Sequence, residues 1–179
     1  MQTIDCILTR RSIRKFTDEP VSHEVLEKIV AAAAYAPSWK NTQIARYIAI
    51  EDPKLKEKIA NDCTKCFTYN AGTMTSAPML IAVTVLKNRC GYERDGSFTT
   101  SRGASWQMFD AGIASQTFAL AAHEYGLGTV IMGIFDDELS DVLEIPEDRE
   151  LVNIICIGYP AESPEAPKRK SVSDLLTYK

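Results

Sequence analysis

Hydrophobic and polar positions along the first half of the chain follow the two periods that distinguish helices from strands. Residues 3–10 carry apolar side chains at helical spacing, which predicts a short first helix. A longer apolar stripe follows Ser22, a good N-cap residue, and predicts a second helix that ends before Pro37. Residues 46–50 and 78–86 are rich in β-branched and aliphatic side chains, so they predict two strands.

The middle of the chain joins a polar loop to an unusually apolar helix. Residues 53–60 predict a third helix, because a proline stands at its first position. Residues 87–103 are polar and contain several glycines, which predicts a long exposed loop of the kind that often covers a site. Residues 104–125 are helical in pattern and apolar on almost every side. One small subunit hardly covers such a helix, so we expect a subunit interface there.

Two further strands and a tail without a core complete the pattern. Residues 129–134 and 151–157 predict strands, and a short helix is expected to begin at Asp136. Strands interspersed with helices predict an α+β or mixed α/β domain, with one sheet flanked by helices. The tail from Gly158 is rich in proline and charge, so it is either disordered or packed along another surface.

Composition narrows the class of protein without defining its chemistry. The 179 residues are 45% hydrophobic and 25% charged, which fits one soluble globular domain. The formal net charge of -4 argues against a general nucleic-acid binder, which needs a basic surface. No apolar run could span a bilayer, and residues 1–10 lack the apolar segment of a signal peptide. We therefore expect no membrane association and a cytoplasmic location.

A basic segment follows the first predicted helix. Arg10, Arg11, Ser12 and Arg14 place three guanidinium groups and a hydroxyl close together. Guanidinium groups match the geometry of phosphate oxygens, so the segment is a candidate site for a phosphate monoester. A basic turn exposed to solvent is the plainer interpretation, and spacing alone favours it.

A second polar segment begins at the helix-stopping Pro37. Ser38, Trp39, Asn41 and Gln43 combine a hydroxyl, an aromatic ring and two carboxamides. Carboxamides both donate and accept hydrogen bonds, which the polar edge of an isoalloxazine ring requires. An ordinary polar loop is the simpler interpretation of this segment when it is taken alone.

Taken as an ordered set, these segments resemble the nitroreductase family. The matching stretches are Arg10-Arg11-Ser12-x-Arg14, Pro37-Ser38-x-x-Asn41-x-Gln43, the helix from Trp106 into Leu127-Gly128-Thr129, Met132-Gly133-Ile134, Gly158-Tyr159-Pro160 and Lys168-Arg169. Together they span nearly the whole chain. Many members follow the glutamine with Pro-Trp, whereas this chain has Ile44-Ala45. That departure concerns substrate specificity more than flavin binding.

The resemblance implies a fold, an assembly and a cofactor. The fold would be an α+β sandwich with a mostly antiparallel central sheet flanked by helices, and residues 1–179 would form a single domain. Two copies would make an intertwined homodimer, in which the tail 160–179 packs on the partner subunit. FMN would lie in a cleft between the subunits, and NADH or NADPH would reduce it before a small oxidised acceptor, such as a nitroaromatic or a quinone, is reduced. Because the flavin carries the chemistry, no side chain is predicted as a catalytic acid or base.

The implied FMN-binding residues come from separate parts of the chain. The phosphate and ribityl end would be held by Arg10, Ser12 and Arg14, with Arg11 beside them. The phosphate would also be approached by Lys168 and Arg169. The partner chain would bring Pro37, Ser38, Trp39 and Asn41, together with Gln43 of the same motif. The flavin ring would be lined by Ile131, Met132 and Gly133.

Other interpretations stay open. A flavin-storage or redox-sensing protein without efficient NAD(P)H turnover would carry the same binding residues. Cys63 and Cys66 have the spacing of a redox pair or half a metal site, but no second ligand pair accompanies them, so two ordinary thiols and no metal are predicted. The five cysteines are scattered, as is typical of reduced thiols. His23 and His123 are expected to be structural.

Overall fold

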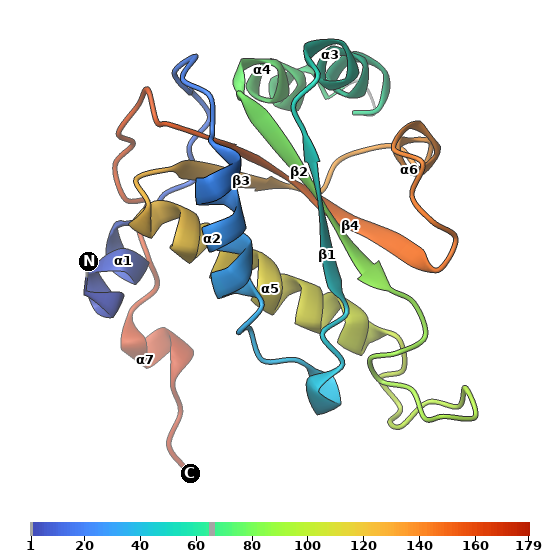
Figure 1. Ribbon diagram of the computed structural model, residues 1–179. Coiled ribbons are helices and arrows are strands. Elements are labelled where there is room, and N and C mark those ends of the chain that lie inside the picture. Colours follow the sequence, from blue (N-terminus) through green and yellow to red (C-terminus); the bar gives the residue numbers. More distant parts are fainter. Residues whose placement is uncertain (1, 65–66) are drawn as a thin grey trace.

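The predicted sheet and its flanking helices are present in the computed structural model, which describes residues 2–64 and 67–179. Four strands pair antiparallel in the order β1-β2-β4-β3. They are β1 (Ala45–Ile50), β2 (Met79–Leu86), β3 (Gly128–Met132) and β4 (Arg149–Gly158). The helices are α1 (Thr3–Thr9), α2 (His23–Ala33), the 3₁₀ turn η1 (Trp39–Asn41), α3 (Pro53–Asp62), α4 (Thr68–Ser76), α5 (Ser105–Glu124), α6 (Leu139–Val142) and α7 (Val172–Leu175). The predicted α+β class is confirmed (Figure 1).

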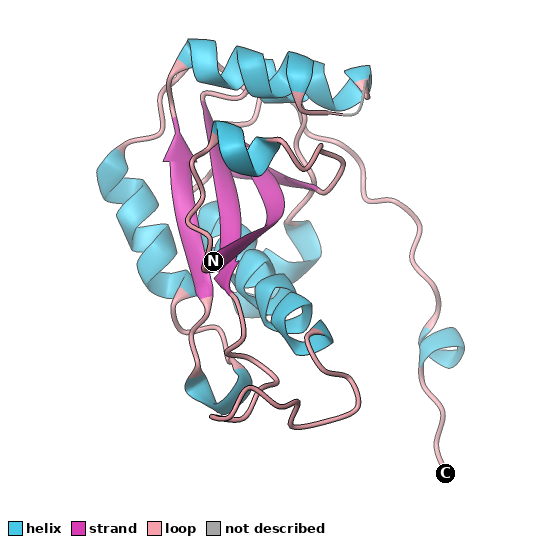
Figure 2. Cartoon of the chain, turned by 90° about the vertical axis from the view of Figure 1, so that its right-hand side faces the viewer, coloured by secondary structure: helices cyan, strands magenta, loops and turns pink. Residues whose placement is uncertain are grey.

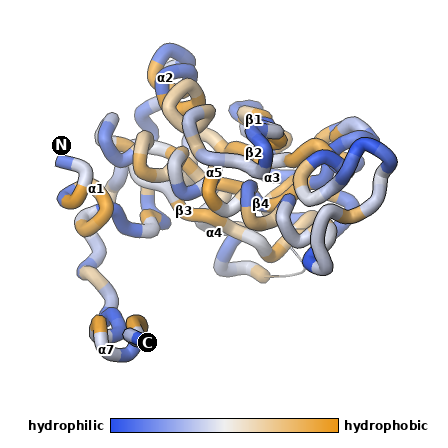
Figure 3. Tube along the Cα trace, turned by 90° about the horizontal axis from the view of Figure 1, so that it is seen from below, coloured by the Kyte–Doolittle hydropathy of each residue, from blue (hydrophilic) through white to orange (hydrophobic). Residues whose placement is uncertain are grey.

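Helices cover both faces of the sheet because its central strands are apolar on both sides. Side chains alternate along a strand, so Leu80 and Ala82 of β2 lie in a hydrophobic cluster with residues of α3, α4 and α6. Met79, Ile81 and Val83 point the other way and lie in a cluster with residues of α2 and α5. Figure 3 shows the hydrophobic residues gathered along these strands and α5, with hydrophilic residues at the periphery.

Local signals account for the ends of the early helices. The Ser22 hydroxyl accepts the Val25 N–H at 3.3 Å, which confirms Ser22 as the N-cap of α2. Pro53 stands in the first turn of α3, where the Asp52 carboxylate accepts the Lys54 N–H at 3.0 Å. The four predicted strands and the long apolar helix, α5, are also confirmed within a few residues at each end.

The sequence predicts a short helix from Asp136, but this start was wrong, since α6 begins three residues later, at Leu139. Asp136 lies in the preceding turn, where its N–H donates to the Cys63 carbonyl at 2.9 Å and its carbonyl accepts the Leu139 N–H at 3.1 Å. The helix α4 was not predicted at all. Its buried residues include the polar Asn70 and Thr73, so the segment has no clear apolar stripe from which a helix could be inferred.

The segment 87–103 is a loop, as predicted, but it is fastened to the domain near both ends. Cys90, Gly91 and Gly103 are buried. Gly91 has a φ of +84°, and a Cβ at that position would lie 2.6 Å from the Gly103 carbonyl oxygen. Only glycine satisfies both conditions, so this close approach of the two loop ends depends on Gly91.

The C-terminal tail builds no core of its own, as predicted. Residues 163–179 are exposed, and their one helical turn, α7, is held by a capping box between Ser171 and Asp174. Figure 2 shows the tail running away from the layered body of the chain. Within the described residues, no helix combines the length and apolar character needed to cross a membrane.

Candidate functional site

The basic segment after α1 is held against the edge strand β3 by backbone pairing. Ser12 forms a parallel bridge with Thr129, and the Ile13 N–H donates to the Thr129 carbonyl at 3.0 Å. On the next residue, the Arg14 N–H donates to a Glu162 carboxylate oxygen at 2.7 Å. The position of the basic segment is therefore fixed by the sheet on one side and by the start of the tail on the other.

This arrangement gathers the predicted basic residues around one pocket of about 260 Å³. The lining residues are Arg10, Arg11, Ser12, Arg14, Pro164, Glu165, Pro167 and Arg169. Four guanidinium groups face one carboxylate, so the pocket favours an anion. Whole cofactor sites typically measure roughly 300–1,000 Å³, so the pocket has room for one end of a cofactor only.

The guanidinium groups of the pocket differ in how many hydrogen-bond acceptors their own chain provides. Arg11 donates to the Leu8 carbonyl at 2.7 Å and to the Arg10 carbonyl at 2.8 Å, which caps the C-terminus of α1. The Arg10 Nε, in contrast, is buried and has no hydrogen-bond partner among the described residues. Buried donors are almost always paired. Arg10 lines the basic pocket, and a phosphate oxygen bound there would be an acceptor for its Nε.

His123 of α5 lies near the same basic segment. Its Nε2 is 2.9 Å from the Thr9 hydroxyl. Burial lowers the pKa of His123, and the nearby charges of Arg10 and Arg11 lower it further. The imidazole is therefore neutral near pH 7 and joins α5 to α1, which agrees with the predicted structural role.

The second predicted segment forms a tight loop at the end of α2. Lys40, Asn41 and Gln43 have positive φ values of 45°, 55° and 47°. Inside the loop, the Gln43 N–H donates to the Ser38 hydroxyl at 3.0 Å, and the Gln43 carboxamide donates to Asn41 Oδ1 at 3.1 Å. The Trp39 N–H donates to a residue outside the loop, the carboxylate of Asp110 on α5, at 2.9 Å. The loop thus holds its polar side chains on a fixed frame.

A groove of about 600 Å³ runs beside this loop, between α2 and β1. Pro37, Ser38 and Gln43 line its loop end, and most of the remaining lining is apolar. Among the described residues, none lines both this groove and the basic pocket. A single chain therefore keeps the two predicted halves of the site apart.

The third predicted group lies at the end of β3. Ile131 and Gly133 are exposed, and Ile131 keeps 45% of its surface exposed. The Met132 side chain is buried in the core, where its sulfur lies 3.7 Å from the Cys156 thiol. Any contribution of Met132 to a ligand would come from its main chain, because its side chain faces the opposite way.

Lys168 and Cys63 line neither of these pockets. Lys168 is exposed and does not line the basic pocket, although its neighbour Arg169 does. Cys63 is a buried free thiol, and Cys66 lies outside the described residues.

The sequence reasoning missed Asp110, the buried carboxylate on α5 that accepts the Trp39 N–H. One signal was available. Asp110 is the single charged residue between Ser105 and Ala122 in a helix that is mostly apolar. A buried charge is unfavourable unless hydrogen bonds compensate it, so such a residue marks a specific contact.

Comparisons with known proteins agree with this geometry. Residues 7–159 match the model of the nitroreductase family. The FMN reductase (NAD(P)H) of Bacillus subtilis strain 168 is 30% identical, and the match covers 99% of this chain and 74% of that protein. The chain belongs to the nitroreductase family.

Solved structures show the same fold. A nitroreductase family protein of Clostridium novyi NT has a TM-score of 0.78 and 28% identity, with 93% of this chain and 89% of that one covered. A Desulfovibrio desulfuricans protein solved in complex with FMN has a TM-score of 0.76 and 26% identity, with 100% and 97% covered.

Proposed function

We propose that this protein is an FMN-dependent oxidoreductase, which passes electrons from NADH or NADPH to small oxidised acceptors such as nitroaromatics or quinones. Family membership, the FMN reductase relative and the FMN-bound neighbour support the choice of cofactor. The observation that carries the proposal is the basic pocket, in which Arg10 has a buried donor without a partner in the described chain.

The residues of the chain would bind and orient the cofactor. Guanidinium groups of Arg10, Arg14 and Arg169 would hold the phosphate, and the Ser12 hydroxyl would add a hydrogen bond. The side chains of the 37–43 loop, Asn41 among them, would contact the polar edge of the ring. When bound, FMN supplies the redox chemistry, in which two electrons enter as a hydride from NAD(P)H and leave to an acceptor.

A second copy of the chain would complete the site. The basic pocket and the 37–43 loop share no described lining residue within one chain, so the loop would come from the partner. Exposed apolar side chains support an interface, because large apolar patches mark association surfaces. They include Ile4, Ile7 and Leu8 of α1 and Met108 and Phe109 of α5, where Phe109 is 58% exposed.

We further propose that the tail 160–179 packs on the partner in the groove between α2 and β1. The tail carries four exposed hydrophobic side chains, which are Val172, Leu175, Leu176 and Tyr178. β1 is an edge strand, whose outer backbone groups are open to pairing. The Tyr47 hydroxyl in the groove is buried without a partner in the described chain, and burial raises the pKa of Tyr47 to about 12. A peptide segment would supply both the apolar and the polar contacts.

The visible absorption spectrum of the purified protein tests the main proposal. We expect two flavin bands that bleach when NADH or NADPH is added under argon and return when a quinone is added. Bands that never bleach with either nucleotide would favour flavin storage or sensing, without turnover. A protein that takes up no FMN even after incubation with it would contradict the proposal.

Removal of residues 171–179 tests the role of the tail. We expect light scattering to show dimers for the full chain and a shift toward monomers for the shortened one. A shortened chain that dimerises with unchanged affinity would contradict tail packing while leaving flavin binding as a separate question.

A further inference from the structure

Two residues of the 37–43 loop, Lys40 and Gln43, adopt a backbone conformation that their side chains do not favour. Lys40, Asn41 and Gln43 all lie in the left-handed region, with φ values of 45°, 55° and 47°. Residues other than glycine, asparagine and aspartate rarely adopt this backbone region. Such conformations persist only where the surrounding structure over-determines them. The loop therefore depends on contacts that hold it in place.

Hydrogen bonds inside the loop fix its shape but not its place on the domain. The Asn41 N–H donates to the Ser38 carbonyl at 3.0 Å, and the Gln43 N–H donates to the Ser38 hydroxyl at 3.0 Å. Both bonds begin and end within residues 38–43. Attachment to the rest of the molecule must come from other groups.

Asp110 provides a buried attachment point on α5. Its Oδ2 accepts the Trp39 N–H at 2.9 Å. Asp110 is 5% exposed, and Cys90 of the 87–103 loop is fully buried. Burial and the neighbouring carboxylate of Asp110 raise the pKa of Cys90 to about 12, so the thiol keeps its proton. One buried carboxylate thus binds the 37–43 loop and lies beside the first residues of the 87–103 loop.

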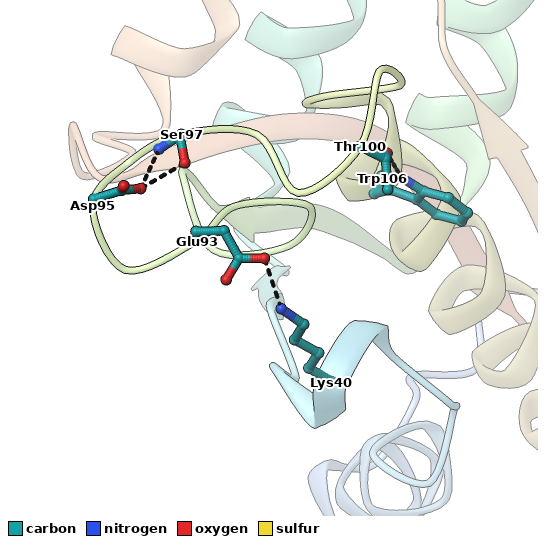
Figure 4. Close-up of polar contacts among 6 residues, drawn as sticks. All are labelled: Lys40, Glu93, Asp95, Ser97, Thr100 and Trp106. Atoms are coloured by element: carbon teal, nitrogen blue, oxygen red, sulfur yellow. Dashed lines mark hydrogen bonds and ion pairs between the residues drawn. The ribbon is translucent and has the colours of Figure 1, made fainter.

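Two weaker contacts join the same loops nearer the surface. The Lys40 ammonium lies 3.0 Å from a Glu93 carboxylate oxygen, and the rings of Trp39 and Trp106 have centroids 4.8 Å apart. Trp106 in turn donates to the Thr100 hydroxyl at 2.8 Å (Figure 4). Lys40 and Glu93 are each about half exposed, so their ion pair contributes little. The buried carboxylate is the stronger of the attachments.

The charge of Asp110 has no cationic partner among the described residues, since none of their salt bridges includes it. A buried carboxylate in that position is unfavourable unless its hydrogen-bond donors stay in place. The folded domain therefore resists any movement that withdraws the Trp39 N–H from Asp110. Because Asp110 needs this donor, the loop is constrained at Trp39, the residue after Ser38.

We propose that Asp110 is a positioning residue for the flavin site, which fixes the place of the 37–43 loop on α5 by accepting the Trp39 N–H. The inference rests on the proposed function, because only there does the 37–43 loop reach a flavin. Asp110 itself acts through Trp39 and the backbone of the loop.

Three variants test this role. Asp110→Ala removes the acceptor, and Asp110→Asn keeps an oxygen that can accept the Trp39 N–H. Gln107→Ala is the matched control, because Gln107 is buried one turn earlier on α5 and accepts the Asn88 N–H at 2.7 Å. That bond anchors the start of the 87–103 loop and makes no contact with the 37–43 loop.

We expect Asp110→Ala to weaken FMN binding about 10- to 100-fold, which corresponds to the loss of one charge-assisted hydrogen bond. Asp110→Asn should recover most of that affinity, and Gln107→Ala should leave it close to wild type. Titration of FMN into apoprotein, followed by flavin fluorescence, measures these affinities. Equal losses in Asp110→Ala and Gln107→Ala, or no loss in Asp110→Ala, would overturn the proposal.

Hydrogen exchange of single amides, followed by NMR, gives a readout that does not depend on flavin. Asp110→Ala should speed exchange of the Trp39 amide, and Gln107→Ala should speed exchange of the Asn88 amide instead. If Asp110→Ala does not fold, Asp110→Asn still decides the question. The proposal requires that the Trp39 amide of Asp110→Asn exchange more slowly than an amide without a hydrogen bond. A wild-type chain that binds no FMN would contradict the proposed function, whereas unchanged exchange at Trp39 would contradict the role of Asp110.

Discussion

The basic pocket and the 37–43 loop are built in opposite ways. The basic segment extends the sheet through ordinary backbone pairing, as in the bond from the Ile13 N–H to the Thr129 carbonyl, and then presents charged side chains. The loop leaves regular structure, bends through three left-handed residues and depends on backbone N–H groups that donate to side-chain oxygens of residues such as Ser38 and Asp110. One half of the proposed site is placed by the fold, and the other half is placed by a few side chains.

This difference assigns a different kind of recognition to each half. A charged pocket on a rigid strand edge recognises a phosphate wherever the rest of the ligand goes, and its contribution is screened by salt. A loop that offers hydroxyl and carboxamide groups recognises the shape and polar edge of a ring. Comparing FMN with riboflavin, which lacks the phosphate, separates the two contributions.

The largest effect is expected from Arg10→Ala. We expect it to weaken FMN binding about 10- to 100-fold, because it removes a buried guanidinium donor of the basic pocket that lacks a partner in the described chain. Riboflavin binding should be unchanged, and added salt should weaken FMN binding less than in the wild type. Isothermal titration with both ligands measures this.

Lys15→Ala is the control for Arg10→Ala. Lys15 belongs to the same segment, and its loss changes the net charge by the same amount as the loss of Arg10. Unlike Arg10, Lys15 does not line the basic pocket. An equal loss of FMN affinity in Lys15→Ala would show that overall charge matters and that the pocket does not.

The next effect is expected from Gly128→Ala, which tests whether the sheet places the basic segment. A Cβ at Gly128 would lie 2.6 Å from Ile13 Cγ1 and 2.7 Å from Ile13 Cβ, so the basic segment must move away from β3. Overpacking of this kind costs about 1–3 kcal/mol of unfolding free energy. Each kcal/mol lowers the midpoint of thermal unfolding by about 2–4 °C in a chain of this size.

Gly72→Ala in α4 is the matched substitution, since a Cβ there meets nothing within 4 Å. We expect it to stabilise the protein by about 0.5–1 kcal/mol, because alanine favours the helix more than glycine does. If Gly128→Ala is as well tolerated as Gly72→Ala, close packing of Ile13 against β3 does not determine the position of the basic segment.

The same contrast explains which parts of the molecule could be predicted from the sequence. The apolar stripe of α2 and the continuous apolar run of β2 are both visible in the order of residues. The basic segment was visible by composition, but its pairing with Thr129 joins distant parts of the chain and depends on the completed sheet. For α4, whose buried face includes polar residues, no such stripe existed.

The loop was the harder half to predict. Pro37 and Ser38 mark a turn, but nothing in the side chains of Lys40 and Gln43 indicates a left-handed backbone. Asp110 stood out as a charge in an apolar helix, yet its partner is the backbone N–H of Trp39. Backbone groups look alike in a sequence, so tertiary packing alone decides which of them a buried carboxylate meets.

A moderate effect is expected from Ser38→Ala, which removes the hydroxyl that accepts the Gln43 N–H. We expect FMN and riboflavin binding to weaken alike, by about 2- to 10-fold, since one neutral hydrogen bond is lost. Ser22→Ala removes a bond of the same kind at the N-cap of α2 and should lower stability without changing the affinity for either ligand. A loss confined to FMN would place Ser38 with the phosphate half of the site.

The smallest effect is expected from the exposed ion pair between Lys40 and Glu93. A hydrogen bond from Thr99 and the ion pair with Lys40 hold the pKa of Glu93 below its ordinary value of 4.5. Because the pKa is lowered in the folded state, the stabilisation is fully present above pH 4.5 and is lost as the pH falls through the folded value. Single substitutions, Lys40→Ala or Glu93→Gln, should change FMN affinity by less than about threefold at pH 7.

A double-mutant cycle on Lys40 and Glu93 isolates their coupling from the other contacts of the loops. The coupling should be measurable at pH 7, be lost as the pH falls through the lowered pKa of Glu93, and shrink in high salt. The Glu24–Lys28 pair on α2 is the control, since it is also exposed, with a 2.7 Å contact, but joins residues of one helix. Disrupting that pair should leave flavin affinity unchanged. If Lys40 and Glu93 couple as strongly when Glu93 is protonated as at pH 7, charge does not hold these loops together at the surface, and the attachment of the 37–43 loop rests on its buried contacts alone.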